Sequence, residues 1–178
     1  MAINRKTELI IDRRFDPNRC QHTINGRVHV LHCHHYLSLY TQLAEDCGML
    51  DARKLLTEVA EDTFYEVLAD YYREHGLESV ADRITIAEQY YALTGLGQMR
   101  VLAAGRDSGE VELLHSHADG GWIKKWGKRE KPVNYITCGY IAALFAAIFG
   151  LPSRSFAAME TASIVSGAER SEFVVAAR

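Results

Sequence analysis

Four histidines and a cysteine fall within the seven positions from His29 to His35. Neutral imidazole and thiolate bind zinc and iron, so this segment is a candidate half of a metal site. His115 and His117, at period two in a predicted strand, share one face and can supply the other half. We therefore consider a zinc or iron site formed by His32, His34, His115 and His117. The spacing matches no established metal motif, and the alternative is that these imidazoles hydrogen-bond locally or face solvent.

Cys33 is a candidate nucleophile, because a helix begins at this point of the predicted structure and a helix N-terminus lowers the pKa of a thiol. His34 follows it in sequence and could act as the base. Glu160 lies on the apolar face of a predicted strand with Phe156 and Ala158, where burial would raise its pKa or require a partner. Cys33, His34 and Glu160 are the catalytic set if the protein is an enzyme; a structural ion pair is the alternative for Glu160.

Aromatic side chains gather around the predicted apolar helix of the C-terminal half, and such groups either bind flat apolar ligands or pack in the core. A cavity between a helical layer and a sheet would take its polar groups from His32 or His34, His117 and Tyr135. The candidate ligand-binding residues are His32, His35, His117, Trp122, Trp126, Tyr135 and Tyr140.

The composition is that of a globular protein: 48% of the 178 residues are apolar, 24% are charged, and the net charge is −3. Basic residues form only one short run, Lys124 to Lys131, either a solvated loop or a lid over an anionic ligand, so we expect no nucleic acid partner. No apolar run reaches the roughly 18 residues of a membrane span. Four cysteines without a CxxC pair indicate reduced thiols and a cytoplasmic location.

The spacing of apolar and turn residues predicts an N-terminal arm, residues 1–19, followed by one domain, residues 20–178. The domain opens with a hairpin around Asn25-Gly26. Two further pairs of strands and four helices follow, which predicts an α+β fold with an antiparallel sheet packed against a helical layer. The predicted strands are 20–24, 27–32, 98–104, 110–117, 155–165 and 171–176, and the predicted helices are 35–47, 51–75, 79–95 and 133–149. Residues 118–132 are predicted to form a loop.

The segment from Pro132 to Ala176 resembles the end of the 4-vinyl reductase domain family. That family has a G-[FY]-x-x-G motif near the start of an apolar helix, then G-[RK]-P, then a strand with E-x-x-C, a Gly and a second Cys. Gly139-Tyr140 and Gly150-Leu151-Pro152 match the helix and its end, and Glu160 and Gly167 match the final hairpin. The resemblance implies the fold that this family shares with vesicle-tethering subunits.

The resemblance implies a dimeric sensor of aromatic or hydrocarbon molecules. In many members of the family, three Cys and a Glu hold a zinc ion. The corresponding positions here are Asn134, Glu160, Ser163 and Ser171, so we expect the family zinc site to be absent. Any zinc or iron would have to use the N-terminal histidines.

The first hypothesis is therefore a stand-alone, homodimeric binding domain for a small apolar or aromatic molecule, acting as a sensor or accessory protein. The second is a small hydrolase or lyase that uses His and Cys, with or without a metal. The third, suggested by the vesicle-tethering relatives, is a non-catalytic assembly subunit with an exposed apolar patch.

Overall fold

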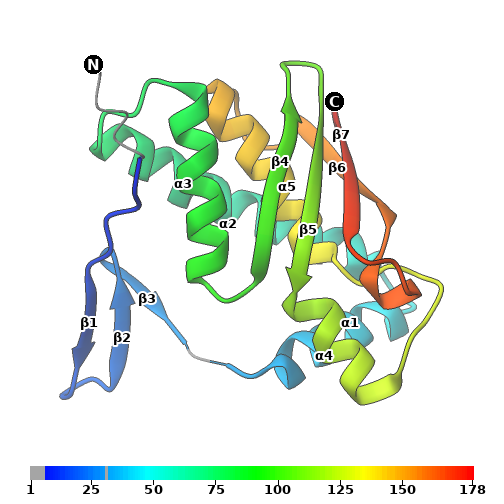
Figure 1. Cartoon of the computed structure of the whole chain (residues 1–178). Coiled ribbons are helices and arrows are strands. Elements are labelled where there is room, and N and C mark those ends of the chain that lie inside the picture. Colours follow the sequence, from blue (N-terminus) through cyan, green and yellow to red (C-terminus); the bar gives the residue numbers. More distant parts are fainter. Residues whose placement is uncertain (1–6, 31) are drawn as a thin grey trace.

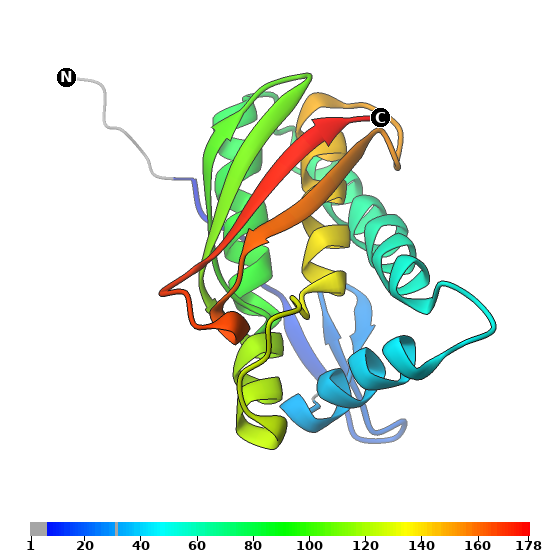
Figure 2. The same ribbon diagram turned by 90° about the vertical axis from the view of Figure 1, so that its right-hand side faces the viewer.

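The computed structural model describes residues 7–30 and 32–178; the first six residues of the predicted arm and Leu31, in the second predicted strand, lie outside this range. A four-stranded sheet covers one side of the main body, and helices α2, α3 and α5 lie behind it (Figures 1 and 2). The helices are α1 (His34–Asp46), α2 (Ala52–Glu74), α3 (Val80–Leu93), α4 (His117–Trp126) and α5 (Tyr135–Phe149). The main-sheet strands are β4 (Gly97–Ala104), β5 (Ser108–Ser116), β6 (Phe156–Ala162) and β7 (Ser171–Ala177).

The main sheet has the order β4-β5-β7-β6 and is antiparallel throughout, as predicted. Its edges are therefore β4 and β6. The short 3-10 helix η1 (Ile164–Ser166) lies between β6 and β7, so β6 ends at Ala162 and not at the predicted residue 165. Phe156, Phe173 and Val175 turn inward and are buried against the helices.

Helix α5 is the central element, packed between the sheet and α2 (Figure 2). Every residue from Gly139 to Ile148 is buried, as expected for the predicted apolar helix. Gly139 makes close packing possible, because a Cβ there would lie 2.2 Å from the Thr57 carbonyl oxygen of α2. Gly150 ends the helix with a φ of 65°, in the left-handed region that glycine favours.

The starts of α2 and α3 follow the sequence signals. Asp51 accepts a hydrogen bond from the backbone N–H of Lys54 at 3.1 Å, and Ser79 accepts one from that of Asp82 at 3.4 Å. Helix α2 is only partly buried, however, since its apolar side chains Leu55 and Val59 are exposed. These two side chains lie on the N-terminal half of α2, which the main sheet does not cover.

The N-terminal strands β1 (Arg13–Asp16), β2 (Gln21–Ile24) and β3 (Arg27–His29) form a separate three-stranded sheet beside the main body (Figure 1). The predicted hairpin turn is present, because Ile24 pairs with Arg27 and Asn25 and Gly26 have φ values of 49° and 77°. The prediction that this strand continues to His32 is wrong. β3 ends at His29, so His32 lies in the link to α1.

Helix α4 corrects the prediction of a loop over residues 118–132. Ser116 caps it by accepting a hydrogen bond from the backbone N–H of Asp119 at 3.0 Å. Gly120 and Gly121 disfavour a helix locally, but Gly121 lets α4 approach His34 of α1 closely. Because α4 begins at His117, that histidine does not share a strand face with His115.

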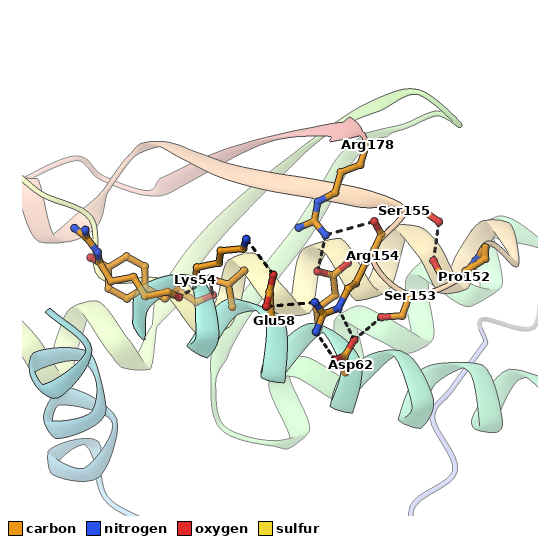
Figure 3. A network of polar contacts seen from close by, with 12 residues as sticks. Lys54, Glu58, Asp62, Pro152, Ser153, Arg154, Ser155 and Arg178 are labelled. Carbon is orange, nitrogen blue, oxygen red and sulfur yellow. Dashed lines mark hydrogen bonds and ion pairs between the residues drawn. The ribbon is translucent and has the colours of Figure 1, made fainter. Parts of the chain in front are cut away.

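A polar network fixes α2 to the end of the sheet (Figure 3). Arg154, between α5 and β6, binds Asp62 at 2.7 Å and Glu58 at 3.3 Å. Arg178 lies 3.3 Å from the fully buried Glu61. No helix in the described ranges is both long and apolar enough to cross a membrane.

Candidate functional site

The start of α1 and the start of α4 bring three imidazoles together. The ring centres of His32 and His34 lie 6.0 Å and 6.1 Å from that of His117. Burial lowers the pKa of His117, and the neighbouring His32 and His34 lower it further. Burial also lowers the pKa of His34, and the nearby charges of His35 and Lys124 lower it further. We call His32, His34 and His117 the histidine cluster.

Cys33 lies directly before α1 and is exposed, but its neighbour is not the predicted one. The Cys33 sulfur lies 3.3 Å from Nδ1 of His35, whereas His34 faces His117. Glu160 lies elsewhere, beside Asn134 of the segment that precedes α5. No recorded contact among the described residues joins the predicted catalytic set of Cys33, His34 and Glu160.

The structure does not bring all four predicted metal ligands together. His115 lies on β5, exposed and opposite Gln98, and makes no recorded contact with the histidine cluster. Within residues 7–30 and 32–178, no three His, Cys, Asp or Glu residues are grouped so that they could hold a metal ion.

A buried carboxylate, Asp119, lies where the predicted family zinc positions meet. It accepts hydrogen bonds from the Asn134 amide at 2.8 Å and the Val165 backbone N–H at 3.0 Å. It also accepts from the Ser163 and Ser171 hydroxyls, at 3.2 Å and 3.3 Å. Four donors from three segments of the chain therefore satisfy one fully buried side chain. We call these five residues the Asp119 cluster.

The Asp119 cluster does not fit a zinc ion. Zinc sites of this kind use thiolates, and the three corresponding side chains here are an amide and two hydroxyls, Asn134, Ser163 and Ser171. Each of them already donates its hydrogen bond to Asp119. The observed contacts hold the same elements together without a metal, and we derive no chemistry through one.

A groove of about 380 Å³ lies beside the Asp119 cluster, between the start of α2, the start of α5 and the edge strand β6. Glu160, Cys138 and Asn134 line it together with apolar side chains of the walls. Exposed cations from α2 and from the loop before α5 also line it. The full lining is Arg53, Thr57, Lys131, Pro132, Asn134, Tyr135, Cys138, Ala158, Met159 and Glu160. We call this the Glu160 groove.

Glu160 has one satisfied and one free oxygen. Oε1 accepts a hydrogen bond from the Asn134 amide at 2.8 Å, while Oε2 is buried with no partner. Burial raises the pKa of Glu160, and the hydrogen bond from Asn134 opposes this shift. Burial and the nearby Glu160 also raise the pKa of Cys138 to about 12, so this thiol stays protonated.

The predicted ligand-binding aromatics are divided among three regions. Tyr140 is fully buried in the core and donates to the Ala87 carbonyl at 2.6 Å. Trp122 packs in a second core with Arg129 stacked 4.6 Å above its ring, and Trp126 lies against Trp122. Only Tyr135 of the predicted set lines the Glu160 groove, where its hydroxyl donates to Glu45 at 2.8 Å.

Sequence reasoning missed Asp119, Arg53, Lys131 and Cys138 as residues of this region. For Asp119 a signal exists: Ser116 and Asp119 have the S-x-x-D spacing of a capping box, which marks the start of α4. For the other three no local pattern exists, since α2, the loop and α5 meet only in the folded chain.

No protein-family model and no curated protein sequence matches the chain. Solved structures do. The phenol-responsive sensory domain of the transcription activator PoxR, in complex with phenol, superposes with a TM-score of 0.75 at 17% identity, over 93% of this chain and 84% of that one.

A trafficking protein particle complex subunit 3 from Naegleria fowleri, covalently bound to palmitic acid, gives a TM-score of 0.53 at 15% identity, over 81% of this chain and 91% of that one. A vinyl-4-reductase family protein from Methanocaldococcus jannaschii gives 0.51 at 13% identity, over 81% and 77%. At these identities the likeness shows the fold. The chain has the 4-vinyl reductase-like α+β fold that the resemblance of its C-terminal segment implied.

Proposed function

We propose that this protein is a binding domain for a small molecule and that the Glu160 groove is its binding site. The observation that carries the proposal is the free, buried Oε2 of Glu160 at a groove with largely apolar walls. Ligand sites typically combine an apolar surface with a few polar groups that orient the ligand. A buried oxygen without a hydrogen bond is costly, and a ligand that pairs with it removes that cost.

The size of the groove suits a small-molecule ligand. Its volume of about 380 Å³ lies at the lower end of the range of small-molecule sites. Other grooves have similar volumes, for example about 360 Å³ for the one lined by Val30, His32, Tyr36 and Tyr40, so the volume does not by itself single out this site.

We propose that the bound small molecule gives the protein a sensory or accessory role. The fold is shared with a sensory domain that responds to phenol, which supports a role of this kind without assigning the ligand. Asn134 joins the Glu160 groove to the Asp119 cluster, and the cluster holds α4, η1 and β7. A ligand that moves Glu160 therefore acts directly on the contacts between these elements.

We propose further that the protein is a homodimer formed through α1. Tyr36, Leu39, Tyr40 and Leu43 recur at the spacing of one helix face and are all 42–56% exposed. Such a stripe in contact with water is typical of a subunit interface. Light scattering on Leu43→Glu should give a monomer, whereas Leu102→Glu, an equally exposed leucine on β4, should leave a dimer.

The binding proposal is tested by blocking the groove. Met159 is 62% exposed and lines the groove, so Met159→Trp should fill it with little effect on folding. A panel of small aromatic and aliphatic molecules is measured by calorimetric titration. Ligands of the wild-type protein should lose binding to Met159→Trp but not to the control Met49→Trp, whose methionine is 95% exposed. Equal binding by both variants would place the ligand site elsewhere.

A second candidate function, hydrolysis or lyase chemistry through Cys33, is favoured by one contact: the 3.3 Å between its sulfur and His35. Turnover of small esters and thioesters tests it. If Cys33 is the nucleophile, Cys33→Ser and His35→Gln should both abolish turnover and leave groove binding intact. Unchanged rates would remove this candidate.

A further inference from the structure

We infer that the ligand of the Glu160 groove is a small aromatic carboxylate that also carries a hydroxyl group. The inference rests on the proposed function, because it assigns a ligand class to the same groove. It follows from three features: two exposed cations, an apolar wall, and a buried oxygen that requires a hydrogen-bonding partner.

Arg53 and Lys131 give the exposed part of the groove a positive charge. Both side chains are exposed, and both line the groove from different elements, α2 and the loop before α5. Among residues 7–30 and 32–178, the one ion pair of Arg53 is with Asp51, at the long distance of 4.0 Å. Lys131 has no ion pair among the described residues. Two cations with so little compensation favour an anionic group on the ligand.

The neighbouring Arg129, unlike Arg53 and Lys131, has its charge balanced by a carboxylate. Arg129 lies 2.8 Å from a carboxylate oxygen of Glu45, and its guanidinium covers Trp122. The second oxygen of Glu45 accepts from the Tyr135 hydroxyl. Arg129 and Glu45 thus balance each other beside the groove, which leaves Arg53 and Lys131 as the cations available to a ligand.

The walls between these cations and Glu160 are apolar. Pro132 from the loop, Ala158 and Met159 from β6, and the protonated thiol of Cys138 form this surface. A methionine and a proline beside an alanine provide flat, adaptable contacts for a ring. An aromatic ring fits the available volume with room for one substituent at each end.

A hydroxyl group on the ligand can serve as the partner of Glu160. Oε1 is already used by Asn134, and only Oε2 is free. Glu160 lines the groove, so a ligand bound there lies next to this carboxyl group. A hydroxyl can donate to a carboxylate or accept from a carboxylic acid, so it pairs with Glu160 in either protonation state.

The experiment is a calorimetric comparison of four probes on the full chain: 4-hydroxybenzoate, 4-hydroxybenzamide, benzoate and phenol. The amide has the shape of the acid without its charge, and benzoate lacks only the hydroxyl. We expect 4-hydroxybenzoate to bind roughly tenfold more tightly than each of the other three, in line with charge-assisted hydrogen bonds. The preference over the amide should shrink in high salt, because the cations are exposed.

Two variants test which residues cause the preference for 4-hydroxybenzoate. Lys131→Gln should reduce the preference for the acid over the amide, while Lys128→Gln, an exposed lysine outside the groove lining, should not. Glu160→Leu should remove the preference for 4-hydroxybenzoate over benzoate. Because each result is a ratio of two affinities for one protein, a partial folding defect leaves it unchanged.

The possible results distinguish a wrong ligand class from a wrong binding site. If the amide or phenol binds the groove as tightly as 4-hydroxybenzoate, the ligand class is wrong and the binding function stands. If larger neutral molecules bind and none of the four probes competes with them, the ligand class is again wrong. If Met159→Trp changes the binding of no ligand, the groove is not the site and both proposals fail.

Discussion

The side-chain amide of Asn134 lies 2.8 Å from an oxygen of Glu160 and 2.8 Å from an oxygen of Asp119. One residue therefore joins the floor of the Glu160 groove to the buried Asp119 cluster. The Ser116 hydroxyl donates to the amide oxygen of Asn134 at 2.9 Å and fixes which way the amide faces. Asn134 can transmit a displacement of Glu160 to α4 because it bonds both carboxyl groups.

The Asp119 cluster should contribute strongly to stability. Asp119→Ala leaves the Asn134, Ser163, Ser171 and Val165 donors without their acceptor, in a fully buried place. We expect the free energy of unfolding to fall by about 3 kcal/mol. Urea denaturation measures it, with Asp107→Ala in the exposed β4–β5 turn as the control. A loss below about 0.5 kcal/mol would contradict the importance of the cluster.

Gly120 and Gly121 form a matched pair within α4. A Cβ at Gly120 meets no atom within 4 Å, so Gly120→Ala should stabilise the protein by about 0.5–1 kcal/mol through helix propensity. A Cβ at Gly121 would lie 2.8 Å from Cβ of His34, so Gly121→Ala should destabilise it by about 1–3 kcal/mol. Thermal unfolding of both variants gives the comparison. Effects of the same sign would show that α1 and α4 do not pack as described.

The histidine cluster should make the protein less stable in mild acid. The folded pKa of His117 is lowered by burial and by His32 and His34. As the pH falls below the unfolded value of about 6.5, the unfolded chain takes up the proton first, so the free energy of unfolding decreases. His117→Gln should reduce the difference between pH 7.5 and pH 5.5, as measured by urea denaturation. His115→Gln, which alters an exposed histidine on β5, should leave that difference unchanged.

The four cysteines should differ in reactivity. Cys33 is exposed beside His35, whereas the pKa of Cys138 is raised to about 12 by burial. An alkylating reagent near neutral pH should therefore modify Cys33 in the folded protein and Cys138 only after unfolding. Mass spectrometry of digested samples identifies the modified sites, and the exposed Cys20 serves as the positive control. Rapid native modification of Cys138 would contradict the raised pKa of its thiol.

Most of the fold could be predicted from local signals. Asn25-Gly26 marks a hairpin, Asp51 and Ser79 are helix caps, and the apolar run ending at Gly150 is a buried helix. These features depend on neighbours in sequence, so the sequence alone contains them. Helix α4 was missed because two adjacent glycines lower helix propensity, and the packing that compensates comes from α1.

The candidate site was harder to predict for the same reason. The clustering of histidines drew attention to the start of α1, and His32, His34 and His117 do meet there. The Glu160 groove instead combines residues more than 100 positions apart, Arg53 and Glu160, which no local pattern links. Glu160 could be identified from the sequence because a carboxyl group on an apolar strand face needs either a partner or a raised pKa.

The most direct test of the central claim uses the methionine methyl groups as reporters in a nuclear magnetic resonance titration. Met159 lines the Glu160 groove, whereas Met49 is 95% exposed on the link between α1 and α2 and Met99 is buried on β4. On addition of 4-hydroxybenzoate, or of any ligand found in the panel, the account predicts a saturable shift of the Met159 methyl signal and a stationary Met49 signal. A bound ligand that leaves Met159 unmoved would contradict it.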